Sequence, residues 1–285
     1  MATLNYALVT PSFRLDIERC KLLVESAERW VAPSVRHYLV IDARDVAMFR
    51  PLLDSRTEIL VVEDIIPSWL FRVPGVRRFW LSLRTRPVKN WILQQLVKLA
   101  VPAAVNDDVL IYADSDMFFI DHFEPQEFER DGRVPLLLDT GQRGVIRSND
   151  EWQAVGSRLL GIPVEASPDT NYVGNVIWWR RLNALAALRR VEEVTGKSWQ
   201  RAIASLGEFS EYILYGIYSY RVLGGNSGHW TDGTVRTLTY WGTTPLSEQG
   251  LESLRRSRAP HHHSVMISAK SRTAVADIRK VFSLP

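Results

Sequence analysis

The stretch that decides the predicted fold is Val109-Leu110-Ile111-Tyr112-Ala113-Asp114-Ser115-Asp116-Met117-Phe118-Phe119. Its first five residues form a continuous apolar run, which is typical of a buried strand in a parallel or mixed sheet. In an extended chain, side chains two residues apart point the same way, so Asp114 and Asp116 can direct both carboxylates to one point. Because hard divalent cations prefer oxygen ligands, this Asp-x-Asp (DXD) pair predicts a metal site. The alternative is an ordinary Asp-Ser turn at a strand end.

Length, composition and charge describe an ordinary globular protein. The 285 residues, 46% hydrophobic and 24% charged, can form one large α/β domain or two small ones. A single cysteine, Cys20, excludes an intramolecular disulfide and a cysteine-based zinc cluster. The net charge of +3 is compatible with a phosphate-bearing partner but does not imply nucleic acid. No signal peptide and no apolar run of bilayer length are visible, so the expected compartment is the cytoplasm.

The first half of the chain alternates predicted strands and helices. Strands are expected at 6–10, 35–42 and 58–64, with helices at 16–30 and 43–53, and Pro11 is expected to stop the first strand. Acidic residues end the second and third strands. This pattern favours a parallel α/β sheet, in which ligands bind outside the carboxyl ends of the strands. Asp114 and Asp116 would lie at that edge.

The segment 65–88 is expected to be a long loop. Six basic residues and no acidic one occur between Arg72 and Lys89, namely Arg72, Arg77, Arg78, Arg84, Arg86 and Lys89. One hypothesis is a flap whose arginines contact a diphosphate or another anionic group. The alternatives are a solvated basic loop and a surface that rests on an anionic membrane.

The later elements are predicted from helical and strand spacing. Helices are expected at 89–100 (ended by Pro102), 150–160, 181–195, 209–223 and 273–282, with strands at 134–139 and 171–179 and after the histidines. Gln94 and Lys98 stand one turn apart on the first of these helices. The internal Gly174 of the second strand marks a place where a backbone can approach a ligand closely.

Two further groups carry candidate chemistry. Glu208, Glu211 and Tyr215 fall at i, i+3 and i+7, forming either a solvated stripe or a cleft-facing set that holds sugar hydroxyls or supplies a base. In the run His261-His262-His263, the first and third histidines share one side if the chain is extended. An imidazole with two carboxylates suits Mn²⁺ better than Ca²⁺. The alternative is that these histidines are surface residues.

Taken in order, these motifs resemble those of a known class of enzymes. They are Thr10-Pro11-Ser12 with Asp16, Trp91-Ile92-Leu93-Gln94-Gln95-Leu96-Val97-Lys98, Ala113-Asp114-Ser115-Asp116, Glu208-Phe209-Ser210-Glu211-Tyr212 with Tyr215-Gly216, and the late histidines. The chain resembles nucleotide-sugar glycosyltransferases of the A-type fold, most closely a bacterial family of uncharacterised glycosyltransferase-like proteins.

The resemblance implies one α/β domain over residues 1–285 with a Rossmann-like, mixed but mainly parallel sheet flanked by helices. Residues 1 to about 125 would bind the donor, and residues from about 126 to 285 would bind the acceptor. It implies that Asp116 bridges Mn²⁺ or Mg²⁺ to the donor diphosphate, that Asp114 binds the ribose or supports the ion, and that His263 or else His261 is a third ligand. Other site residues implied are Thr10, Pro11 and Ser12 near the nucleobase, Asp16 among the donor-binding residues, Gln94 and Lys98 near the diphosphate or sugar, and Asn171, Gly174, Asn175 and Tyr215 in the acceptor half.

The function implied is metal-dependent transfer of a sugar from a UDP- or GDP-linked donor to a glycan or lipid-linked acceptor, as in polysaccharide biosynthesis. An inverting reaction would need a base, for which Glu211 and Glu208 are candidates, whereas a retaining reaction would not. A lipid-linked acceptor would bring the protein to the inner membrane surface. The alternatives are a nucleotidyltransferase or phosphotransferase, against which the missing P-loop counts, and a non-enzymatic module that binds anionic glycans or nucleic acid. The oligomeric state is not predicted.

Overall fold

The central sheet has five strands in the order β12-β7-β1-β2-β3. The computed structural model describes residues 3–73, 79–141, 148–166 and 168–284. The strands are β1 (Tyr6–Ser12), β2 (Arg36–Ile41), β3 (Thr57–Val61), β7 (Val109–Tyr112) and β12 (Ile177–Arg180). All pairs are parallel except β12 with β7. Parallel strands β7, β1, β2 and β3 therefore end at one common edge.

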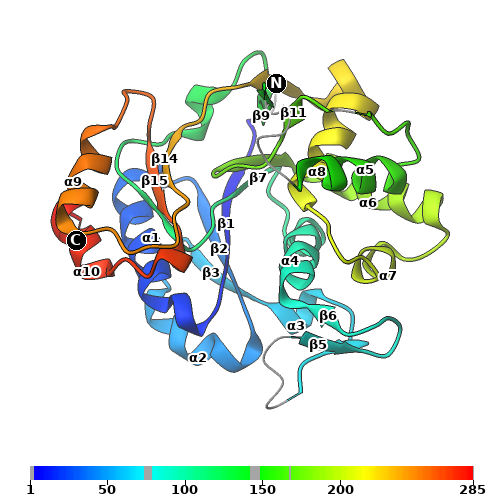
Figure 1. Ribbon diagram of the computed structural model, residues 1–285, viewed down its shortest axis with the longest axis horizontal. Helices are drawn as coiled ribbons and strands as arrows, with labels where there is room; N and C mark the ends of the chain where they lie inside the picture. The colour runs from blue at the N-terminus through cyan, green and yellow to red at the C-terminus, as the bar shows by residue number, and fades with distance from the viewer. Residues whose placement is uncertain (1–2, 74–78, 142–147, 167, 285) are drawn as a thin grey trace.

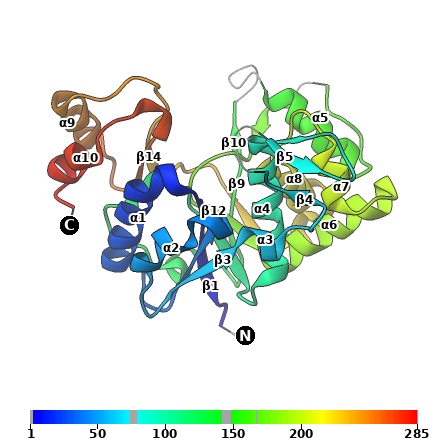
Figure 2. The same cartoon turned by 90° about the horizontal axis from the view of Figure 1, so that it is seen from below.

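Helices cover both faces of this sheet (Figures 1 and 2). On one face, Ala7, Val9, Leu110 and Tyr112 pack against α4 (Asn90–Ala104), α6 (Arg181–Thr195) and α8 (Glu211–Ile217). On the other face, the alternate strand residues pack against α1 (Ile17–Trp30) and α2 (Val46–Phe49). A strand presents successive side chains to opposite faces, so a run that is apolar at every position must be covered on both sides.

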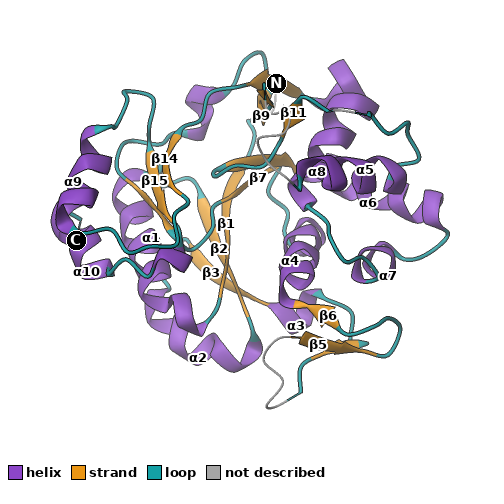
Figure 3. Cartoon of the chain, in the orientation of Figure 1, coloured by secondary structure: helices purple, strands orange, loops and turns teal. Residues whose placement is uncertain are grey.

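Smaller sheets extend the fold (Figure 3). One consists of β14 (Thr237–Tyr240), β15 (Ser264–Ile267) and β8 (Met117–Phe119), and its β15 runs antiparallel to β8. The others pair β13 (His229–Asp232) with β9 (Val134–Leu137), β10 (Asp139–Thr140) with β11 (Thr170–Asn171), and β4 (Leu70–Phe71), β5 (Phe79–Ser82) and β6 (Val88–Lys89) with one another. The remaining α-helices are α3 (Val62–Ile65), α5 (Asn149–Leu159), α7 (Trp199–Ala204), α9 (Glu248–Arg256) and α10 (Val275–Phe282).

The predicted fold class, a mixed and mainly parallel sheet flanked by helices, is confirmed. The prediction that Pro11 stops the first strand is wrong, because β1 continues to Ser12 and Pro11 pairs in register with Val40. The pairing of β1 with β7 ends at Val9, whose carbonyl accepts a bond from the Ala113 N–H. In a parallel ladder, residues two apart direct their backbone groups to the same side. The N–H that Pro11 lacks would have pointed toward β7, whose pairing with β1 has already ended at Val9. The proline therefore removes no hydrogen bond from the sheet.

The prediction that Pro102 ends the helix is also wrong, since α4 continues through it to Ala104. A proline inside a helix deprives the carbonyl four residues earlier of its donor. That carbonyl belongs to Lys98, and it accepts a hydrogen bond of 2.8 Å from the Tyr112 hydroxyl instead. A side chain from the central strand β7 thus completes the helix, and the sequence around the proline gives no sign of it.

We expect Tyr112→Phe to destabilise the protein by about 1–3 kcal/mol, because it leaves the Lys98 carbonyl buried without a donor. Adding Pro102→Ala should recover part of that loss, since alanine restores an N–H at the position that serves this carbonyl. Urea unfolding of the single and double variants measures both effects. Equal stability of Tyr112→Phe and the wild type would contradict this role for the hydroxyl.

In the described part of the chain, no helix is both long enough and apolar enough to cross a membrane.

Candidate functional site

Asp114 and Asp116 leave the carboxyl end of β7, at the edge where the parallel strands end. The Met117 N–H donates to the Asp114 carbonyl, which makes a tight turn into β8. One carboxylate oxygen of Asp116, Oδ2, accepts a bond of 2.9 Å from the Ala269 N–H, just beyond β15. The two aspartates are therefore fixed by two different sheets, and both side chains remain partly exposed.

A third carboxylate, that of Asp16, lies near this pair. Asp16 directly precedes α1, is partly buried, and hydrogen-bonds to Ser115 between the two aspartates. Burial and the negative charges of Asp114 and Asp16 together raise the pKa of Asp116 to about 6, against the opposing effects of the Ala269 N–H and Arg19. Burial also raises the pKa of Asp16. The site thus concentrates negative charge that a bound cation would stabilise.

Lys98 connects these aspartates to the opposite helix. Its side chain on α4 is only 3% exposed, and its Nζ lies 2.9 Å from Asp114 and 3.1 Å from Glu211. It also donates to the Tyr212 hydroxyl at 2.9 Å. Burial opposes the charge on Lys98, but Asp114, Tyr212 and Glu211 overcome that effect and raise its pKa well above the ordinary value. Lys98 is therefore a buried ammonium held between two carboxylates.

Glu211 is held at the first turn of α8. Its side chain is 2% exposed, and the Ser210 hydroxyl caps the helix by accepting from the Ile213 N–H. The side-chain oxygen of Gln95 accepts from the Glu211 N–H at 3.3 Å. Burial raises the pKa of Glu211, and Lys98 offsets this only in part. A solvated stripe is therefore wrong for Glu211, which lies inside the protein.

The residues predicted for the donor site differ in their exposure. Thr10 is fully buried, and its hydroxyl lies 2.9 Å from Nε2 of His37. Pro11 is buried in β1, whereas Ser12 is partly exposed at the strand end. Gln94 is exposed, and its neighbour Gln95 is the glutamine that the structure brings to the site. Sequence reasoning missed Gln95 because helical spacing alone did not show which face was buried.

The late histidines are not brought together with the aspartates. The His263 carbonyl accepts from the Ile120 N–H, and its Nδ1 lies 2.7 Å from the His122 carbonyl. Asp116 instead meets Ile267, four residues further along β15, a backbone separation of roughly 13 Å. His261 packs against His262 at 4.5 Å between ring centroids. Within the described ranges, no three His, Cys, Asp or Glu side chains are grouped to hold one ion.

Three of the four predicted acceptor residues line one cavity of about 340 Å³, namely Asn171, Gly174 and Asn175. Gly174 approaches Leu137 so closely that an added Cβ would lie 2.6 Å from Cδ2 of that leucine. Asn175 lies two residues before Ile177, and Asp114 lies two residues after Tyr112, the partner of Ile177 in the sheet. The cavity therefore adjoins the edge that carries the aspartates.

Two other predicted residues do not line this cavity. Tyr215 is 2% exposed, stacks on Trp179, and places its hydroxyl 2.6 Å from Nε2 of His229. It also accepts a bond from the Arg180 N–H, so its polar atom is already bound inside the core. Glu208 is exposed and precedes α8, so it lies outside the helical stripe that its spacing indicated.

Two arginines of the basic segment contact neighbouring side chains of the protein. Arg72 lies 3.0 Å from Asp42, which follows β2, and its guanidinium stands over the Trp80 ring. Arg84 stands over Trp69. Arg77 and Arg78, which the flap hypothesis included, lie outside the described residues.

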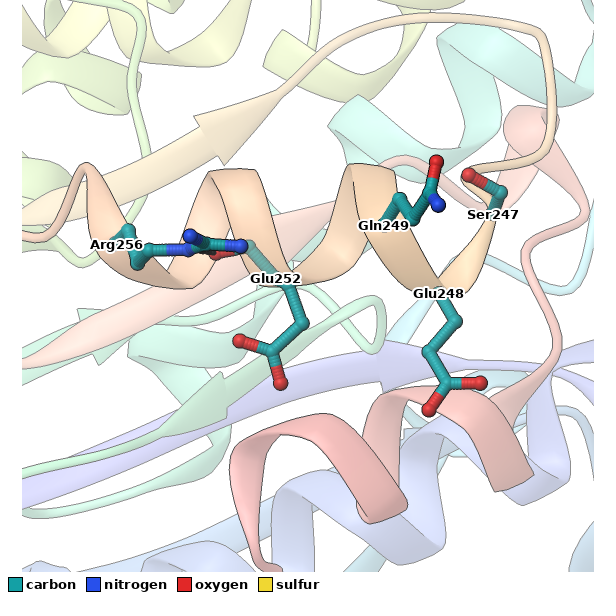
Figure 4. Close-up of a pocket in the computed structure, with 5 residues that line it drawn as sticks. All are labelled: Ser247, Glu248, Gln249, Glu252 and Arg256. Atoms are coloured by element: carbon teal, nitrogen blue, oxygen red, sulfur yellow. Dashed lines mark hydrogen bonds between the residues drawn. The ribbon is translucent and has the colours of Figure 1, made fainter.

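A larger hollow of about 520 Å³ runs along α9 and is lined by Ser247, Glu248, Gln249, Glu252 and Arg256 (Figure 4). These side chains belong to a single surface helix. Glu248 pairs with Lys280 of α10, and Glu252 pairs with Arg255 of the same helix. The five residues that line this hollow include no buried polar group and no aromatic side chain. We therefore place the candidate site at the strand ends and not here.

The fold and site define an α/β protein with a carboxylate-rich centre beyond the carboxyl ends of its parallel strands. Residues 6–265 match the model of a family of unknown function, DUF6492, and the chain belongs to that family. Among solved structures, it is similar to the apo form of mouse xyloside xylosyltransferase 1, with a TM-score of 0.47 and 11% identity over 93% of this chain and 98% of that one. The comparison with curated proteins finds no match.

Proposed function

We propose that the protein is a metal-dependent glycosyltransferase that uses a nucleotide-activated sugar. The observation that carries the proposal is the buried Lys98, held between Asp114 and Glu211 beside a second aspartate at the common strand edge. Departure of a nucleoside diphosphate develops negative charge on its phosphates. A fixed cation near that position stabilises the transition state more than the bound donor.

The aspartates fit a divalent ion of the Mg²⁺ or Mn²⁺ type. Such ions take one or two protein carboxylates and complete their coordination with water and substrate phosphates. Asp116 would be the main ligand, and Asp114 and Asp16 would supply further negative charge beside it. When bound, the ion would supply Lewis-acid stabilisation of the diphosphate. The late histidines are not needed for this ligand set.

Lys98, Glu211 and Tyr212 supply charge to the site and hold its side chains in place. Lys98 supplies a fixed positive charge and holds Asp114 in one orientation, while Glu211 and Tyr212 fix the ammonium from the other side. Only 2% of the Glu211 side chain is exposed, so we assign this residue to positioning and not to proton abstraction from an acceptor. Ser12, at the end of β1, is our candidate near the nucleobase.

The proposal is tested by incubating the protein with UDP- and GDP-sugars, Mn²⁺ and a mixture of glycan acceptors, with product masses read by mass spectrometry. We expect a mass increase of one sugar on an acceptor, or slow release of free sugar and nucleotide, both abolished by Asp116→Ala. Transfer of the nucleotide itself would instead indicate a nucleotidyltransferase. Turnover unchanged in Asp116→Ala would reject the metal role.

A further inference from the structure

The cavity between the second-half strands combines an aromatic rim with polar walls. Trp241 directly follows β14 and is 66% exposed, although exposing the apolar surface of an indole ring to water is unfavourable. Around it the cavity presents Asp139, Asn175 and Arg236. A flat exposed aromatic surface beside converging hydrogen-bonding groups matches the two-sided chemistry of a sugar ring, which has apolar C–H faces and a hydroxylated edge.

The charges in the cavity indicate which sugars fit. Arg236 is paired with Asp232, so these two charges cancel. The carboxylate of Asp139 has no hydrogen-bond or ionic partner among the described residues and gives the lining an excess negative charge. An anionic diphosphate or acidic sugar would be repelled there, whereas hydroxyl groups can donate to the carboxylate. The cavity therefore selects against the donor and favours a neutral glycan.

The backbone beside the cavity is strained. Val176, which lines it, has a φ of 57°, a conformation that is a genuine outlier for a β-branched residue. Such strain costs of order 1–3 kcal/mol and persists where the surrounding structure requires it, often at binding sites. Here it turns the chain sharply between Asn175 and Ile177, the first residue of β12. Asn175 is thereby placed in the cavity wall, with its amide 3.4 Å from the Thr239 hydroxyl.

We infer that this cavity binds a neutral glycan, whose terminal ring stacks on Trp241 and whose hydroxyls bind Asp139 and Asn175. Its volume of about 340 Å³ accommodates one or two sugar rings. Its position beside the edge that carries Asp114 makes this glycan the acceptor, an assignment of role that rests on the proposed function.

The test is saturation-transfer NMR with three neutral disaccharides, cellobiose, lactose and N,N′-diacetylchitobiose, and with digalacturonic acid as the anionic probe. We expect at least one neutral disaccharide to bind, with digalacturonic acid weaker. Trp241→Ala should weaken binding at least tenfold, and Trp241→Phe less than threefold, because phenylalanine keeps a ring. Tyr220→Ala removes an aromatic residue of 45% exposure outside the cavity and should leave binding unchanged.

Asp139→Asn should reduce the ratio of the affinity for neutral disaccharides to the affinity for digalacturonic acid. Absence of binding by every neutral disaccharide, or equal binding by Trp241→Ala at an unchanged melting temperature, would overturn the inference. Nucleotide binding in the presence of Mn²⁺ is measured separately on the wild type. Glycan binding without nucleotide binding would support the glycan site in this cavity and overturn the proposed function. Nucleotide binding without glycan binding would retain the proposed function and overturn this inference.

Discussion

Replacing Lys98 with methionine should destabilise the protein by about 3–5 kcal/mol, because it leaves the buried carboxylate of Glu211 without its counter-ion. Methionine fills a similar volume, so the loss reports charge and not a cavity. Adding Glu211→Gln removes the isolated charge and should recover at least about 1 kcal/mol. The free energies of unfolding in urea at pH 7.5 give all three values.

The matched control for this cycle is Lys89→Met, at the exposed residue just before α4, which should change stability by less than about 0.5 kcal/mol. A Lys98→Met variant within about 1 kcal/mol of the wild type, or a double variant no more stable than the single, would contradict a charged Lys98–Glu211 pair. Such a result would also remove the fixed cation from the proposed mechanism.

Asp116→Asn should have opposite effects on activity and stability. Sugar transfer should fall at least about 100-fold, which corresponds to loss of about 3 kcal/mol of transition-state stabilisation. Stability above pH 6 should rise by about 1–2 kcal/mol, a figure discounted for the partial exposure of the carboxylate. A residue that only supports the fold would lower both.

The pH dependence follows from the sign of the shift. The pKa of Asp116 is raised from 3.8 to about 6, so between these values the folded protein holds a proton that the unfolded chain has lost. Wild-type stability therefore declines as the pH rises from about 4 to 6, and the asparagine variant lacks this contribution. Thermal unfolding from pH 4 to 8 measures it, with Asp64→Asn as a control at an exposed aspartate. Parallel curves for Asp116→Asn and the wild type would show that folding does not raise the pKa of Asp116.

Local signals in the sequence predicted much of the fold. The bounds of α6 at Arg181–Thr195 agree with the prediction because Gly196 ends the helix in a left-handed conformation, at a φ of 64°. Pro102 misled the prediction because its compensation comes from Tyr112, a residue of another element. The end of a helix can thus be predicted from the sequence where a local interaction decides it, and is predicted wrongly where a tertiary interaction decides it.

The candidate site was only partly readable for the same reason. The strand that frames Asp114 and Asp116 predicts these two residues, whereas Lys98 is predicted for the site only by the resemblance to nucleotide-sugar glycosyltransferases. The contact of Lys98 with Glu211 joins two distant segments, and no spacing rule reports it. The histidines were placed near the aspartates without knowledge of the β8–β15 register, in which Phe119 pairs with Ser264 and Met117 with Met266. That antiparallel register sends His263 to the end of β15 away from Asp116.

The claim on which this account depends is that a divalent ion at Asp116 binds the diphosphate of a nucleotide sugar. Isothermal titration of UDP and GDP into the wild type and Asp116→Asn, each with and without Mn²⁺, tests it most directly. The expected result is binding of one nucleotide to the wild type that Mn²⁺ strengthens at least tenfold, and no such strengthening in Asp116→Asn. Nucleotide binding that is indifferent to Mn²⁺, or equal in both proteins, would contradict the account.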